Sequence, residues 1–232
     1  MKPLLMFDMD GTLIDLEKKP KYTGLENKHK PFLSLKAQMK KIAAENGVPA
    51  EVVEDFDRMA LIWNAVRRYA EDNGLAVNEL MKRINEPFME HERDDHNISF
   101  LMPDTIPGLT SLKELGYEMN LVTTASRWSY DRISTSDDYA CFGSFFKHSI
   151  TRDDVSYIKP DPQPLLQMMG LCVRDEAVYI GDSDHDGYAA IAAGCKFVLI
   201  NTRDYDGGTL GLLKPHAVIE NLTQLPDVLG RL

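Results

Sequence analysis

The sequence has few cysteines and no long apolar run. Its three cysteines, Cys141, Cys172 and Cys195, are odd in number and lack the close cysteine and histidine spacing of a zinc site. Free thiols in a reducing compartment fit this usage best. No apolar run approaches the length of a membrane span, and the short run before Asp8 is too brief for a signal-peptide core. We therefore expect a cytoplasmic protein without a membrane partner.

Basic residues are also in deficit. The chain has 26 Lys and Arg against 36 Asp and Glu, a formal net charge of −10. Such a surface repels phosphate backbones, so no nucleic-acid partner is expected, and a small anionic substrate needs a local positive site. With 232 residues and 44% hydrophobic content, the chain is large enough for a proper core, either in one large domain or in a domain with an insertion.

Apolar strand-like runs alternate with helical patterns in most of the chain. Residues 4–7, 119–124, 178–180 and 197–200 have the length and content of buried strands, and small residues at 189–193 predict a helix between the last two. A short strand at 217–219 and a closing helix near Leu225 follow. This alternation predicts an α/β fold built on a parallel sheet.

The region between the first strand and about residue 100 differs, because its pattern is helical throughout. Leu35, Met39 and Ile42 mark a first helix, and a second stripe runs from Pro49 to Gly74. A third amphipathic segment covers 77–88. We predict a small antiparallel helical bundle. The expected organisation is an α/β core domain from residues 1–15 and 102–232, with residues 16–101 inserted.

The first strand ends in Asp8-Met9-Asp10-Gly11-Thr12. The carboxyl ends of parallel strands are where open α/β sheets hold their ligands, so these residues predict an active-site loop. Asp8 has the position of a nucleophile, and Asp10 can point toward the same substrate. Gly11 allows the chain to turn sharply, and Thr12 supplies either a hydroxyl or a helix cap.

Three other polar residues lie at or beside predicted strand ends. Thr124 ends one strand, Asp182 follows another, and Lys159 lies in a loop stiffened by two prolines. Since the carboxyl ends of parallel strands meet at one edge of a sheet, we expect these residues to converge on Asp8.

In order and content these motifs resemble the haloacid dehalogenase superfamily of phosphohydrolases. The four matching segments are Asp8 to Thr12, Thr124, Lys159 with its prolines, and Gly181 to Asp186. The resemblance implies a Rossmann-like core, with the helical insertion as a type 1 cap. It further implies hinges near Leu16 and Met102.

The resemblance also implies a reaction. Asp8 attacks phosphorus to form an aspartyl phosphate, and Asp10 acts first as general acid and then as general base. Lys159 offsets negative charge, and Thr124 helps to hold the transferring oxygens. Phosphate binding is further expected from Gly11, Thr12, Thr124, Ala125, Arg127 and Lys159.

Several carboxylates around a dianionic substrate require a counter-charge, and Mg²⁺ suits such oxygen ligands. The matching ligand positions are Asp8, the carbonyl of Asp10, and Asp182, with Asp186 behind them. Asp186 has a second interpretation as the cap of the following helix.

Asp10 narrows the reaction class, because the dehalogenating and phosphonate-cleaving branches of the superfamily lack an acid at this position. The expected enzyme is a phosphatase acting on a small phosphorylated metabolite, with a general resemblance to phosphoglycolate phosphatases. A sugar-phosphate mutase, with Arg67, Arg68, Lys82 and Arg83 as candidate grips for a second phosphate, is the alternative. A catalytically silent binding protein is the alternative of another class.

The sequence allows two interpretations for some residues. Arg127 either reaches the phosphate or begins a helix, and His185 is either a solvated residue at a helix start or a catalytic one. The segment Lys18 to Pro31 either lines the entrance to the site or is a plain linker. The sequence does not indicate the oligomeric state.

Overall fold

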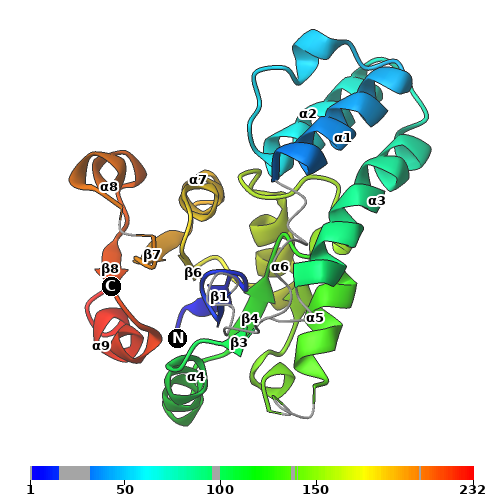
Figure 1. Ribbon diagram of the computed structural model, residues 1–232. Helices are drawn as coiled ribbons and strands as arrows, with labels where there is room; N and C mark the ends of the chain where they lie inside the picture. The colour runs from blue at the N-terminus through cyan, green and yellow to red at the C-terminus, as the bar shows by residue number, and fades with distance from the viewer. Residues whose placement is uncertain (1, 16–31, 96–99, 137–138, 140, 204) are drawn as a thin grey trace.

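A six-stranded, fully parallel sheet forms the centre of the molecule (Figure 1). The computed structural model describes residues 2–15, 32–95, 100–136, 139, 141–203 and 205–232. The strand order is β5-β4-β1-β6-β7-β8. The strands are β1 (Leu4–Phe7), β4 (Met119–Val122), β5 (Ser149–Ile150), β6 (Ala177–Gly181), β7 (Lys196–Ile200) and β8 (Ala217–Ile219). The predicted α/β fold class with a parallel sheet is confirmed.

Strand β1 is in the interior of this sheet, with β4 on one side and β6 on the other. All four of its residues are buried, and they alternate between two hydrophobic cores: Leu5 and Phe7 belong to one, and Leu4 and Met6 to the other. A strand covered on both faces reads as a continuous apolar run, which is why the sequence pattern identified it.

Helices cover both faces of the sheet. Helices α4 (Thr105–Glu114), α5 (Arg127–Ser134) and α9 (Leu225–Leu229) contribute to the core that contains Phe7. Helices α6 (Gln163–Cys172) and α7 (Asp184–Ala192) contribute to the core that contains Met6, and α8 (Gly207–Leu213) contacts α7. Small residues of α7, Ala189 and Ala190, are fully buried, as the close approach of this helix to the sheet requires.

The helical insertion forms a third layer beyond one end of the sheet (Figure 1). Helices α1 (Phe32–Glu45), α2 (Met59–Asp72) and α3 (Val77–Asp95) contact one another and share a hydrophobic core with Met39, Val66 and Ile84 at full burial. Strands β2 (Ile14–Asp15) and β3 (Phe100–Leu101) pair antiparallel. The chain therefore leaves and re-enters the α/β core at neighbouring points.

The predicted start of the second helix is wrong. Pro49 precedes only a short 3₁₀ turn, Ala50–Val52, and the helix proper begins at Met59. Val52 and Phe56 are partly buried against the core of the insertion. Their apolar spacing therefore indicated packing, but not an α-helix. The predicted stops hold: Gly47 and Gly74 adopt φ values of 86° and 67° just past helix ends.

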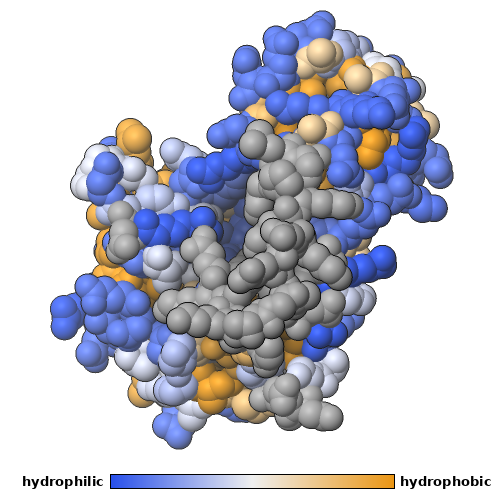
Figure 2. All heavy atoms as spheres, in the orientation of Figure 1, coloured by the Kyte–Doolittle hydropathy of each residue, from blue (hydrophilic) through white to orange (hydrophobic). Residues whose placement is uncertain are grey.

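Within the described ranges, no helix is both long and apolar enough to cross a membrane. In the view of Figure 2 the helical insertion is mostly hydrophilic on its outside. Buried apolar residues of α1, α2 and α3 pack together in one hydrophobic core, which also includes Ile158 of the α/β part.

Candidate active site

Asp8, Asp182 and Lys159 lie together at one edge of the sheet. Asp8 follows β1, and its backbone N–H still pairs with the carbonyl of Ile180 in β6 at 2.9 Å. Asp182 directly follows β6. Both acids are buried, at 5% and 1% exposure, which is unusual for carboxylates without partners. The loop before α6 brings Lys159 to the same place.

The ammonium group of Lys159 is the centre of this cluster. It donates to Asp8 Oδ1 and to Asp186 Oδ1, each at 2.6 Å, and to the hydroxyl of Tyr179 at 2.5 Å. The hydroxyl of Tyr179 in turn donates to the carbonyl of Val122 in β4 at 2.9 Å. Lys159 is 2% exposed, and its peptide bond to Pro160 is cis. The lysine therefore joins elements that are far apart in sequence.

The charged groups in the cluster shift one another's pKa values. Burial alone would lower the pKa of Lys159, but the carboxylates of Asp186 and Asp8 raise it above its ordinary value. Burial raises the pKa of Asp8; Lys159 opposes this, and the neighbouring Asp186 and Asp182 add to it. Burial and the Asp186 carboxylate keep the pKa of Tyr179 well above its usual range, so Tyr179 stays a neutral hydroxyl.

Asp182 has its own set of partners. Its Oδ2 accepts a hydrogen bond from Arg203 Nε at 2.5 Å, and its Oδ1 lies 3.4 Å from the Thr12 hydroxyl. Burial and Asp186 raise the pKa of Asp182 to about 6 despite the opposing effect of Arg203. Gly11 turns at φ 86°, and a Cβ there would clash with Asp182 Oδ2. The glycine is thus needed both for the turn and for this close contact.

Asp186 has two roles, as a helix cap and as a partner of Lys159. With Ser183 it forms a capping box at the start of α7, and it also pairs with Lys159. Burial raises its pKa, but Lys159 and Ser183 outweigh this and lower it below the ordinary value. Carboxylate oxygens of Asp8, Asp182 and Asp186 all lie within 4.8 Å of one another. A buried group of carboxylates fits a hard divalent cation.

Asp10 lies half-buried, just beyond Asp8, in a short bridge with Ile14. Its charge contributes to the raised pKa of Asp8, which places the two acids close together. The spacing of two residues thus brings both acids to one site.

The loop after β4 begins with Thr123 and Thr124. Thr124 is half-buried, and its carbonyl accepts from Arg152 Nη1 at 2.8 Å. The amide of Ala125 donates to the hydroxyl of Thr123 at 3.1 Å, so this expected phosphate-binding amide already has a partner.

Arg127 does begin a helix, α5, and this interpretation is the one the structure supports. Its guanidinium binds Ser149 Oγ at 2.6 Å and Asp154 Oδ2 at 2.5 Å. The Arg127 side chain is thus held by β5 and the turn after it. Phosphate binding by Arg127 stays a prediction. His185 lies in the first turn of α7, where burial lowers its pKa, with Asp184 opposing. The segment 18–31 lies outside the described residues.

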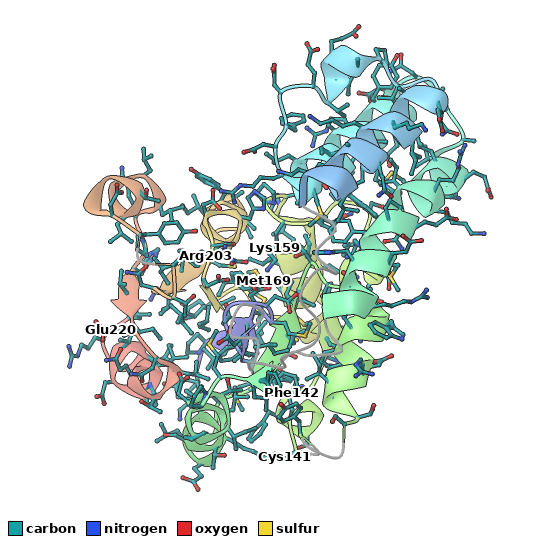
Figure 3. The ribbon with its side chains drawn as sticks, in the orientation of Figure 1. Cys141, Phe142, Lys159, Met169, Arg203 and Glu220 are labelled. Carbon is teal, nitrogen blue, oxygen red and sulfur yellow. The ribbon has the colours of Figure 1, made fainter. Side chains whose placement is uncertain are left out.

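Two residues of the cluster were not found from the sequence. Arg203, labelled in Figure 3, comes from the segment after β7 and pairs with Asp182. The rule that polar residues after a buried strand reach the site applies to it, since it follows the end of β7 by three residues. Tyr179 gave a weaker signal, as the one polar-tipped side chain inside an apolar strand.

This geometry, with a nucleophile candidate held by a buried lysine beside a carboxylate cluster, has known counterparts. The chain belongs to the haloacid dehalogenase-like hydrolases, whose family model matches residues 5–200. The predicted family and hydrolase class are confirmed.

Three curated relatives are named as phosphatases or as a pyrophosphatase. Phosphoglycolate phosphatase 1 of Pseudomonas aeruginosa is 29% identical over 230 residues, covering 96% of this chain and 78% of that protein. Phosphoglycolate phosphatase of Cereibacter sphaeroides is 27% identical, with 99% of each chain covered. Pyrophosphatase PpaX of Bacillus velezensis is 33% identical, but over only 53% of this chain and 56% of its own length.

Solved structures agree on the fold. A 2-haloacid dehalogenase from Pseudomonas syringae pv. Tomato is 25% identical, with 100% of this chain and 99% of that chain covered and a TM-score of 0.55. A HAD-superfamily hydrolase, subfamily IA, from Geobacter sulfurreducens is 19% identical, with 98% and 100% covered and a TM-score of 0.53. These matches confirm the predicted Rossmann-like core.

Proposed function

We propose that this phosphatase is a Mg²⁺-dependent enzyme that hydrolyses the phosphomonoester of a small metabolite through an aspartyl phosphate on Asp8. The observation that carries the proposal is the buried Asp8 carboxylate, held at 2.6 Å by Lys159 beside Asp182 and Asp186. A strand-end carboxylate fixed in this way is oriented for attack on a group that enters from the edge of the sheet.

In the first step, a carboxylate oxygen of Asp8 forms a bond to phosphorus while the ester P–O bond breaks. Asp10 donates its proton to the leaving oxygen. In the second step, water attacks phosphorus, gives a proton to Asp10, and the bond between Asp8 and phosphorus breaks. Lys159 keeps the Asp8 carboxylate in place in both steps, and the Thr124 loop is proposed to hold the non-reacting phosphoryl oxygens.

Mg²⁺ would be held by the carboxylates of Asp8 and Asp182 and the carbonyl of Asp10, with Asp186 behind them. When bound, the cation offsets the combined negative charge of the carboxylates and the phosphoryl group. The raised pKa values of Asp8 and Asp182 indicate that the protein alone leaves this charge incompletely compensated.

For the substrate we propose a small phosphomonoester similar to phosphoglycolate. The relatives that match almost the whole chain, including the inserted helices, have that activity in their names. The match to a pyrophosphatase covers only about half of the chain, so it carries less weight for the substrate.

The helical insertion is proposed to act as the cap that covers this site. It lies beyond one end of the sheet, and its α2 contacts the loop that carries Lys159: Asn64 bonds both backbone polar groups of Ile158. A cover that excludes all but the attacking water protects an aspartyl phosphate from side reactions.

A sugar-phosphate mutase uses the same core but must grip a second phosphate with its cap. Of the basic residues considered for this role, Arg67 pairs with Glu71 and Arg83 with Asn46, both within the insertion. A crystal structure named for a beta-phosphoglucomutase of Thermotoga maritima shares the fold at 19% identity. Arg68 lies 3.8 Å from Asp161 Oδ2 in the Lys159 loop, where an acid already pairs with it. Hydrolysis remains the proposal.

The test is release of phosphate from 4-nitrophenyl phosphate with Mg²⁺ and with a chelator. We expect activity only with the metal, and a loss of about a thousandfold or more in Asp8→Asn, because an amide is a poor nucleophile. Asp175→Asn, which changes an exposed acid elsewhere, is the control. Activity that survives Asp8→Asn would refute the mechanism, and a panel with phosphoglycolate and pyrophosphate would test the substrate.

A further inference from the structure

Arg152 is the largest side chain among the fully buried residues of the described chain. It belongs to the 3₁₀ turn Arg152–Asp154 that follows β5, and it is 1% exposed. Arg152 has no role in the proposed chemical steps. A buried guanidinium needs hydrogen-bond acceptors for its donors, so its partners show what it holds together.

One set of partners lies on helix α3 of the insertion. Arg152 Nη1 donates to Glu92 Oε1 at 2.5 Å, and Arg152 Nε donates to Asn85 Oδ1 at 3.0 Å. The guanidinium also lies 4.1 Å from the centre of the Phe88 ring. The ion pair between Arg152 and Glu92 is buried, because their side chains are 0% and 6% exposed.

The other set of partners is the loop after β4. Arg152 Nη1 donates to the carbonyl of Thr124 at 2.8 Å, and the backbone N–H of Arg152 donates to the carbonyl of Ala125 at 2.9 Å. Glu92 accepts from the backbone N–H of Ser126 at 3.2 Å and from the hydroxyl of Ser129 at 3.1 Å. Residues 124, 125 and 126 are thus each bound through a backbone polar group.

A buried ion pair is a poor device for stability alone, since apolar residues of similar size often stabilise a fold equally well or better. What an apolar pair does not provide is directed hydrogen bonds to a loop backbone. We infer that Arg152 and Glu92 are a positioning pair, which fixes the Thr124–Ser126 loop from helix α3 so that the loop can hold the phosphoryl oxygens. This inference rests on the proposed function, because it takes that loop as the phosphoryl-binding one.

The first variant is the double substitution Arg152→Met with Glu92→Leu, which removes both charges together and avoids an unpaired buried ion. The second is Arg152→Lys, which keeps the charge, although an ammonium cannot reproduce the fork of bonds to Glu92, Asn85 and Thr124. Lys147→Met removes an exposed ion pair with Glu118 and serves as the control.

For the folded double variant we expect kcat on 4-nitrophenyl phosphate to fall about tenfold or more and the inhibition constant of inorganic phosphate to rise by a similar factor. The Mg²⁺ concentration for half-maximal activity should stay within about twofold, because the metal ligands are on other elements. Arg152→Lys should lie in between. Wild-type kcat and phosphate inhibition in either folded variant would overturn the inference, as would an equal loss of Mg²⁺ affinity.

Backbone hydrogen exchange supplies a readout that needs no catalysis. In the metal-free protein, the amide of Ser126 should exchange at least about tenfold faster in Arg152→Lys than in the wild type, while the amide of Asp8 keeps its protection. Unchanged exchange at Ser126 would overturn the inference even if the enzyme is active. A wild-type protein that hydrolyses no phosphate ester would instead refute the proposed function and leave the exchange result to be judged by itself.

Discussion

Lys159 has three N–H donors, and the three acceptors around it account for all of them. Two are carboxylates at 2.6 Å, from Asp8 and Asp186, and one is the Tyr179 hydroxyl at 2.5 Å. Because an ammonium has no lone pair, the hydroxyl accepts from the lysine, and its own proton is left for the carbonyl of Val122 at 2.9 Å or for Asp186 Oδ1 at 3.2 Å. Acceptors from three elements therefore fix the direction of the ammonium group. Burial strengthens these hydrogen bonds in addition to the opposite charges.

Arg203 shows a different relation to a carboxylate. Its side chain is 50% exposed, whereas that of its partner Asp182 is 2% exposed. The guanidinium thus reaches in from the surface to a carboxylate that we propose as a metal ligand. A cation arriving at Asp182 has to compete with this contact.

At the residue scale we therefore predict that Arg203→Gln binds Mg²⁺ more tightly. The half-exposed ion pair contributes about 1 kcal/mol, so its loss corresponds to an affinity gain of roughly three- to tenfold. Calorimetric titration with Mg²⁺ at pH 8 measures this directly. Arg58→Gln is the matched control, because Arg58 pairs with Asp184, which is outside the carboxylate cluster. Equal or weaker Mg²⁺ binding by Arg203→Gln would contradict the competition.

At the element scale, side chains of helix α2 hold the backbone of the Lys159 loop. The side chain of Asn64 donates to the carbonyl of Ile158 at 2.7 Å and accepts from its N–H at 3.0 Å. Trp63 Nε1 also donates to the carbonyl of Ser156 at 3.3 Å. The residue before Lys159 is thus held in the way that a neighbouring strand would hold it.

We predict that Asn64→Asp lowers kcat about tenfold and the free energy of unfolding by about 1–3 kcal/mol. The isosteric carboxylate can still accept from Ile158, but it cannot donate to the carbonyl and places negative charge against it. Chemical denaturation and steady-state kinetics measure the two effects. In Asn73→Asp, where the amide bonds an exposed carbonyl at the end of the same helix, both values should stay near wild type. A wild-type kcat in Asn64→Asp would show that the loop does not depend on α2.

At the scale of the whole molecule, the buried carboxylates of the site lower the free energy of unfolding. Folding transfers Asp182 into a buried place beside Asp186, where its pKa rises from an ordinary 3.8 to about 6. Between these two values the folded protein binds more protons than the unfolded chain. Stability therefore falls as the pH rises through this window, and a bound divalent cation should restore it.

The prediction is that, without metal, the free energy of unfolding declines between about pH 4 and pH 6 in the wild type relative to Asp182→Asn. The difference is on the order of 3 kcal/mol at most. Denaturant titrations of both proteins across this range measure it. At pH 7, added Mg²⁺ should raise the thermal midpoint of the wild type by several degrees and that of Asp182→Asn much less. If the free energy of unfolding changed with pH in the same way in both proteins, titration of Asp182 would not be coupled to folding.

The sequence by itself determined the features that depend on local order along the chain. Apolar strands followed at once by acids, a turn glycine and a hydroxyl were readable because strand and helix periods differ and because parallel strands end at one edge. The same logic placed Asp8, Asp182 and Lys159 together. It failed for the start of α2, where Val52 and Phe56 pack against the core of the insertion although neither residue is α-helical.

Only the tertiary structure decided which polar groups pair. Arg127 follows the Thr124 loop in sequence yet binds Ser149 and Asp154, whereas Arg152, distant from that loop in sequence, holds it. Such choices depend on distances between elements that no local pattern encodes. The order of the residues along the chain therefore predicted the chemistry of the site. Which side chains hold the site residues in place was decided by the packing of the three layers.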